Sequence, residues 1–155
     1  MMTLPWTDIS RICKEFEINP KIIAAIVMQE SAGNPYATRY EDHYRWTLDI
    51  ERFARKNRIS RDTENMQQKT SWGLMQIMGG LARELGFEGP LVRLCEPEIN
   101  LRLGIKHILN LKQRYSKNLS DVIAAYNAGS PRKGADGLYV NNSYVIRVNK
   151  FVKEM

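Results

Sequence analysis

The sequence has few cysteines and histidines, and their positions argue against a disulfide and a metal site. The 155 residues include 2 Cys and 2 His. Cys13 and Cys95 are far apart, and Cys13 lies on the apolar stripe of an expected helix. We therefore expect both thiols to be reduced packing residues. His43 and His107 have no Cys or His neighbours, so we predict no metal site and no cofactor.

Long apolar runs, repeats and low-complexity segments are also missing. The longest apolar run, Ile22 to Met28, is far too short to cross a bilayer, so we expect no membrane insertion. Residues 1–8 contain no basic region followed by an apolar one, so we expect no secretory signal in this chain. The length and the 43% apolar content predict a single domain, residues 1–155.

Basic residues exceed acidic ones without forming a long run. The chain has 23 Lys and Arg against 17 Asp and Glu, a formal net charge of +6. That balance favours an anionic partner such as a cell-wall polymer, a membrane surface or a nucleic acid. The basic residues are scattered, so we predict no nucleic-acid partner. No exposed apolar stripe is evident, which predicts a monomer.

The spacing of apolar residues predicts a mostly helical chain. Helices are expected over about residues 9–16, 20–31, 78–86, 97–111, 121–126 and 142–153. Thr7 or Asp8 would cap the first of these helices, and Ser120 the fifth. Residues 34–70 form a polar, insert-like segment with a helix expected over about 45–56, including Trp46; it is either a lid or cleft wall or a surface loop. The predicted fold class is all-α, or mostly α with at most a small β-hairpin within 34–70.

The segment Ile22–Ser31 places a carboxyl group at the end of an apolar helix face. Asn19 is a favoured N-cap and Pro20 suits the first helical position. The apolar stripe that follows ends in Glu30. Burial on that face and the negative end of the helix both favour the neutral carboxyl group, which predicts a raised pKa for Glu30. A carboxyl group that stays protonated near neutral pH is suited to general acid catalysis.

Three short motifs, in a fixed order, carry a resemblance to a known family. They are Glu30-Ser31, then Gly73-Leu74-Met75-Gln76-Ile77, then Ala125-Tyr126-Asn127-Ala128-Gly129. Together they resemble the signature of the lytic transglycosylase catalytic domain of the soluble (SLT) type, a relative of goose-type lysozyme in the lysozyme-like superfamily. Segments 100–109 and 144–148 resemble the family's central and closing helices. The resemblance implies a lysozyme-like helical domain with a substrate cleft.

The resemblance also implies a substrate and roles for the matching residues. The substrate is the peptidoglycan glycan strand, cut at the β-1,4 bond between N-acetylmuramic acid and N-acetylglucosamine to leave 1,6-anhydro ends. Glu30 matches the family's single catalytic acid and base. The other matching residues are implied to bind substrate or shape the cleft: Ser31, Gly73, Met75, Gln76, Tyr126, Asn127 and Tyr144. Gly73 would let the backbone approach the sugar, Gln76 would bind an N-acetyl or hydroxyl group, and the Tyr126 hydroxyl would hold Glu30 or the substrate.

The stretch between Glu30 and Gly73 is longer than is usual in the family and leaves other activities open. It contains three acidic residues, Glu41, Asp42 and Glu64. Any of them would serve as the second carboxylate with which a goose-type-lysozyme-like muramidase hydrolyses the same bond. A non-catalytic cell-wall binding module is a further alternative, against which the intact Glu30 argues.

The expected absence of a signal also bears on where the protein acts. We expect a protein made in the cytoplasm that reaches the cell wall through a holin, a virion or a secretion machine. That route favours a bacteriophage origin. The alternative is a bacterial enzyme whose signal was removed.

Overall fold

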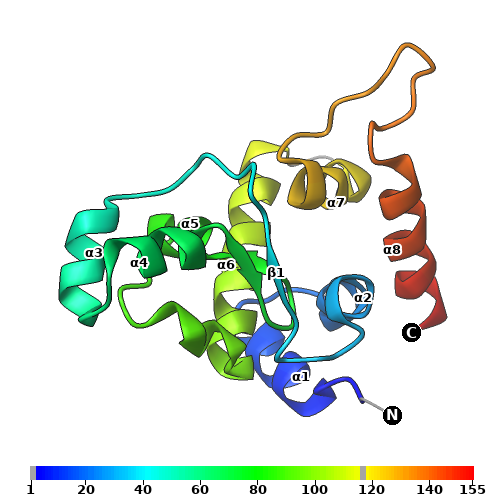
Figure 1. The fold of residues 1–155 in the computed structure, drawn as a ribbon. Coiled ribbons are helices and arrows are strands. Elements are labelled where there is room, and N and C mark those ends of the chain that lie inside the picture. Colours follow the sequence, from blue (N-terminus) through cyan, green and yellow to red (C-terminus); the bar gives the residue numbers. More distant parts are fainter. Residues whose placement is uncertain (1–2, 116–117) are drawn as a thin grey trace.

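The computed structural model describes residues 3–115 and 118–155. Within these residues the chain forms eight α-helices, one 3-10 helix and three short strands (Figure 1). In chain order the elements are α1 (Trp6–Glu15), α2 (Pro20–Ser31), β1 (Thr38–Tyr40), α3 (Ile50–Asn57), α4 (Arg61–Gln68), β2 (Thr70–Trp72), β3 (Ile77–Met78), α5 (Gly79–Glu84), η1 (Leu91–Cys95), α6 (Pro97–Arg114), α7 (Leu119–Ala128) and α8 (Asn142–Glu154).

Helices from the two ends of the chain build the main core. α2 packs on α1 and α8, α6 packs on α1 and α7, and α7 packs on α8. Their apolar stripes are buried as predicted, with Ile23, Leu101, Ile105 and Val148 fully inaccessible to solvent. The predicted Asn19 cap is confirmed, since its side chain accepts a hydrogen bond from the Lys21 N–H. The mostly helical fold class is therefore confirmed.

The small sheet differs from the predicted hairpin. It is antiparallel with the order β1-β2-β3, in which Thr38 lies opposite Trp72, and Trp72 opposite Ile77. A hairpin confined to residues 34–70 is wrong, because β1 pairs with β2 across a connection that contains α3 and α4. Strands of two or three residues are too short to show the alternating pattern that marks a strand in a sequence.

Two predicted helix caps are also wrong. α1 begins at Trp6 without a side-chain cap, so Thr7 and Asp8 lie inside the helix. α7 is capped by Asn118, whose side chain accepts a hydrogen bond from the Ser120 N–H. In both cases the helix starts earlier than the pattern predicts, at Trp6 and at Leu119.

The insert-like segment folds around a buried ion pair. Arg83 of α5 donates to both carboxylate oxygens of Glu64 of α4, at 2.8 and 3.0 Å, and both side chains are fully buried. Gln68 donates to the same carboxylate and also clamps Leu48, through the backbone N–H at 2.7 Å and the carbonyl at 2.8 Å. The sequence did not predict α4, and the helix expected over 45–56 begins only at Ile50.

Residues 44–48 lie outside α3 because they are held against the neighbouring helices. A Cβ atom on Gly80 of α5 would lie 2.7 Å from the Tyr44 ring, so this close approach requires glycine. Trp46, expected within a helix, lies outside α3 and is 66% exposed.

Both thiols are free, with Cys13 buried in the core, as expected. None of the helices in the described part of the chain combines the length and apolar composition that crossing a bilayer requires. Among the same residues, His, Cys, Asp and Glu side chains form no group able to hold a metal ion.

Candidate active site

Glu30 lies in the last turn of α2, and its carboxylate is half-buried. Burial raises the pKa of Glu30, which is the direction the sequence predicts. Two groups oppose this shift: the hydrogen bond from Tyr144 and the positive charge of Arg39 both favour the carboxylate form. The net effect is a carboxyl group that gains and loses a proton at a higher pH than an exposed glutamate.

Tyr144, from the first turn of α8, is the side chain that holds Glu30. Its hydroxyl donates to the Glu30 Oε1 at 2.5 Å. The resemblance implied that the Tyr126 hydroxyl holds Glu30 or the substrate, but this hydroxyl donates to the Met75 carbonyl at 2.6 Å. Burial raises the pKa of Tyr126, and the nearby Glu30 charge raises it further. Tyr144 therefore orients the Glu30 carboxylate, whereas Tyr126 connects α7 to the turn that contains Met75.

Asn100 of α6 holds the turn over residues 73–76 through hydrogen bonds to backbone groups in and beside it. The fully buried Asn100 side chain accepts from the Met75 N–H and donates to the carbonyls of Trp72 and Leu94. Gly73 has φ +72°, and a Cβ there would lie 2.5 Å from the Asn100 Nδ2. Glycine is needed for this packing, so the predicted reason, approach to a sugar, is not what the geometry shows.

Met75 does not line a cleft as predicted. Its side chain is fully buried and packs against Gly104 of α6. Only its backbone contributes to the site, as the acceptor for Tyr126 and the donor to Asn100. A thioether in the core fills an irregular gap between helices, which is a common use of methionine.

Ser31 and Gln76 connect this turn to its neighbours. The Ser31 hydroxyl donates to the Leu74 carbonyl at 2.8 Å, which joins the end of α2 to the turn. Gln76 accepts from the Ser71 hydroxyl, and its amide donates to the carbonyls of Ala37 and Gly73. Both amide hydrogens of Gln76 are thus used inside the protein, and sugar binding by this side chain stays a prediction.

The three candidate second carboxylates lie in different environments. Glu64 is excluded as a reacting group, because its buried pairing with Arg83 leaves it no access to a substrate. Asp42 is exposed and accepts from the Tyr40 hydroxyl at 3.3 Å. Glu41 pairs with Arg39 at 2.8 Å and lines a cavity, which makes it the best placed of the three.

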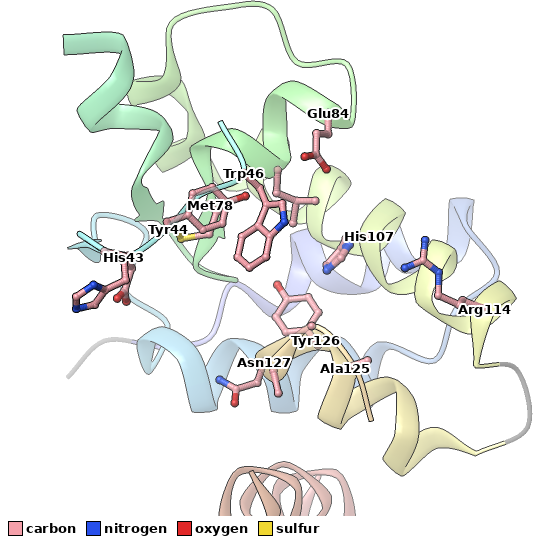
Figure 2. A pocket seen from close by; sticks show the side chains of 14 residues that line it. His43, Tyr44, Trp46, Met78, Glu84, His107, Arg114, Ala125, Tyr126 and Asn127 are labelled. Atoms are coloured by element: carbon pink, nitrogen blue, oxygen red, sulfur yellow. The ribbon is translucent and has the colours of Figure 1, made fainter. Parts of the chain in front are cut away.

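That cavity has a volume of about 730 Å³ (Figure 2), and Tyr126, which lines it, lies within electrostatic range of Glu30. Tyr126 and Asn127 of α7 line it on one side, and Asn127 also accepts from the Asn141 side chain at 2.9 Å. The insert-like segment lines the other side with residues that the sequence did not select: His43, Tyr44 and Trp46. The insert is therefore a wall of the cavity rather than a surface loop.

Sequence reasoning missed these aromatic residues and Asn100. A polar residue among the apolar positions of the central helix was a usable signal for Asn100, since a buried amide needs specific partners. No sequence signal indicates which aromatic residues of the insert face the cavity, because residues 41–48 have no regular period.

Comparison with known proteins agrees with this geometry. The family model described as "Transglycosylase SLT domain" matches residues 9–144, which is most of the chain. The chain belongs to this family. Among solved structures, the SLT domain described here is similar to an inactive glutamate-to-glutamine mutant of the lytic transglycosylase Slt from Pseudomonas aeruginosa. The TM-score is 0.53 and the identity 21%, over 95% of this chain and 21% of that chain.

At that identity, the likeness to Slt shows the fold of the SLT domain and nothing finer. The chain spans about a fifth of the length of the Slt chain it matches. Family membership shows that this chain is a transglycosylase SLT domain.

Proposed function

We propose that this SLT domain cleaves the β-1,4 bond between N-acetylmuramic acid and N-acetylglucosamine, with Glu30 as the acid and then the base. The observation that carries the proposal is the half-buried Glu30, with a raised pKa, which accepts a hydrogen bond from Tyr144 and lies near Tyr126, a residue that lines the 730 Å³ cavity. A raised pKa keeps the carboxyl group protonated where a general acid must work. The proposal also implies a glycan strand as the partner of the cavity.

The reaction proceeds in two proton transfers. Glu30 gives its proton to the glycosidic oxygen as the bond to C1 of the muramic residue breaks and an oxocarbenium-like state develops. The Glu30 carboxylate then removes the proton of the C6 hydroxyl of the same residue, and O6 bonds to C1 to close the 1,6-anhydro ring. One carboxylate suffices, because an intramolecular nucleophile has a high effective concentration.

Hydrolysis of the same bond by water is the second candidate reaction, and the position of Glu41 in the cavity wall is the observation in its favour. Glu41 lines the cavity, and a muramidase uses a second carboxylate to assist the attacking water. Its pairing with Arg39 argues against this role, because the ion pair already occupies one carboxylate oxygen.

Mass spectrometry of fragments released from purified peptidoglycan distinguishes the two outcomes. The proposal predicts anhydro products, lighter by one water than reducing muropeptides. Reducing ends would make the protein a muramidase, and Glu41→Gln would be the next variant to measure. Binding of peptidoglycan without release would favour the non-catalytic alternative.

Tyr144→Phe tests how Glu30 is positioned. Removing the hydroxyl removes a hydrogen bond that favours the carboxylate, so the pKa of Glu30 rises. Activity that needs protonated Glu30 then persists to higher pH, and we expect the alkaline limb of the kcat profile to move upward. Loss of orientation lowers kcat by about 10-fold.

Tyr139→Phe is the matched control for this experiment. The Tyr139 hydroxyl donates to Asp121, away from Glu30, at 2.5 Å. Its loss should leave the kcat profile in place. An unchanged profile in Tyr144→Phe would show that this hydrogen bond does not tune Glu30.

A further inference from the structure

The aromatic wall of the cavity is a built feature of this chain. Tyr44 is fixed against α5: its ring fits the space over Gly80, and its hydroxyl accepts a hydrogen bond from the Leu81 N–H. Trp46 packs edge-on against Tyr44, with ring centroids 5.5 Å apart and an interplanar angle of 66°. The indole is therefore held in one place by its neighbour, although two thirds of its surface is exposed.

An exposed indole at the lip of a cavity indicates a binding surface. Ligand pockets are lined mainly by hydrophobic and aromatic side chains, and a volume near 730 Å³ lies in the range of small-molecule pockets. In Figure 2 the indole of Trp46 and the ring of Tyr126 both point into the cavity, from opposite walls. Two thirds of the Trp46 surface is exposed, so the indole offers contact area to a planar or ring-shaped ligand.

The rim of the cavity is polar and carries both signs of charge. Glu41 and Glu84 contribute carboxylates, Arg114 a guanidinium and Asn127 an amide. These groups offer hydrogen-bond donors and acceptors around an apolar centre. A sugar ring matches this arrangement, since its C–H groups form an apolar face while its hydroxyl and acetamido groups lie around the edge.

The cavity is continuous with the proposed catalytic site. Tyr126 lines the cavity and also lies within the electrostatic reach of Glu30. Glu30 itself does not line the cavity, so the cavity extends away from the carboxyl group proposed to cut the bond. A glycan strand that reaches Glu30 would extend across Tyr126 into the cavity.

We propose that the cavity beside Trp46 binds a sugar unit of the glycan strand beyond the bond that is cut, with its ring stacked on the indole. Trp46 thereby makes cleavage depend on strand length. The inference rests on the proposed function, because it takes the glycan strand as the substrate.

Glycan fragments of increasing length, without stem peptides, test the inference in the intact protein. Trp46→Ala should lower kcat/KM by about 10-fold on long fragments, the effect of one lost stacking contact. On fragments too short to reach the cavity, the variant should match the wild type. Trp46→Phe, which keeps an aromatic face, should recover part of the loss.

Trp6→Ala is the matched control, because Trp6 of α1 is also exposed, at 43%, and does not line the cavity. Its kcat/KM should follow the wild type at every length. Equal behaviour of Trp46→Ala and wild type on all fragments would overturn the inference. A loss on peptide-bearing strands alone would also overturn it and would assign the cavity to the stem peptide.

Binding measured in Glu30→Gln separates this inference from the proposed function. In that background, Trp46→Ala should weaken the binding of long fragments by about the same 10-fold, with no turnover needed. If Glu30→Gln still cleaved peptidoglycan, the role of Glu30 would fail while the length dependence caused by Trp46 remained measurable.

Discussion

Glu30→Gln is expected to lower the release of soluble fragments from purified peptidoglycan by about 10²- to 10⁴-fold, the range of general acid–base catalysis. Glutamine keeps the shape of the side chain and still accepts the hydrogen bond from Tyr144, but it has no proton to give and cannot take one back. Because one residue performs both transfers in the proposed reaction, both steps are lost together.

The matched control is Glu51→Gln, which changes an exposed carboxylate of α3 that is paired only with surface arginines. Its activity should equal that of the wild type. If Glu30→Gln kept more than about a tenth of the activity, a loss smaller than general acid catalysis supplies, Glu30 would not be the acid.

The same variant makes a prediction about stability. Burial raises the pKa of Glu30 above 4.5, so the folded state is destabilised relative to the unfolded state once the pH rises above that value. The glutamine variant has no such penalty. At pH 7 it should unfold at the same temperature as the wild type or higher, and the difference should disappear below pH 4.5.

Arg83→Ala is expected to lower the free energy of unfolding by about 3–5 kcal/mol, because it leaves the Glu64 carboxylate buried without its partner. For a domain of this size the melting temperature should fall by about 10 °C. Arg83 also donates to the carbonyls of Phe87 and Gly89, so its loss frees further buried acceptors. Thermal and urea unfolding monitored by circular dichroism measure the change.

Arg55→Ala provides the comparison, since Arg55 pairs with Glu51 at 3.5 Å on the exposed face of α3. An exposed pair contributes about 0–1 kcal/mol, so its melting temperature should barely change. Replacing both buried partners with apolar residues, Glu64→Leu with Arg83→Met, should restore much of the lost stability. A loss for Arg83→Ala no larger than that for Arg55→Ala would contradict the assignment of a buried pair.

The buried pair also has a consequence for the cavity wall. Gln68 links Glu64 to both backbone groups of Leu48, at the end of the segment that carries Trp46. The sequence treated Glu64 as a candidate for chemistry, while the structure uses it to hold the insert in place. The position of the cavity wall and the stability of the insert therefore depend on the same hydrogen-bond network.

Local features of this protein could be predicted from its sequence. Helix α2, its Asn19 cap and the carboxyl group at its end follow from residues close together in the chain, because helical hydrogen bonds and side-chain spacing extend over only three or four positions. The central helix α6 was equally predictable, since its apolar residues cover much of its circumference. The order of the three motifs indicated the family, which the family model confirms.

Only the tertiary structure decided which side chains meet. Tyr144 lies 114 positions from Glu30 in the chain, and nothing in either segment distinguishes it from Tyr126 as the partner of the carboxylate. The burial of Glu64 depends on Arg83, 19 positions away on another helix, and the place of Trp46 depends on the space over Gly80. Which side chains meet depends on how the helices cross and how closely their surfaces approach each other. Both are determined by the packing of the whole core, not by the spacing of residues within one helix or strand.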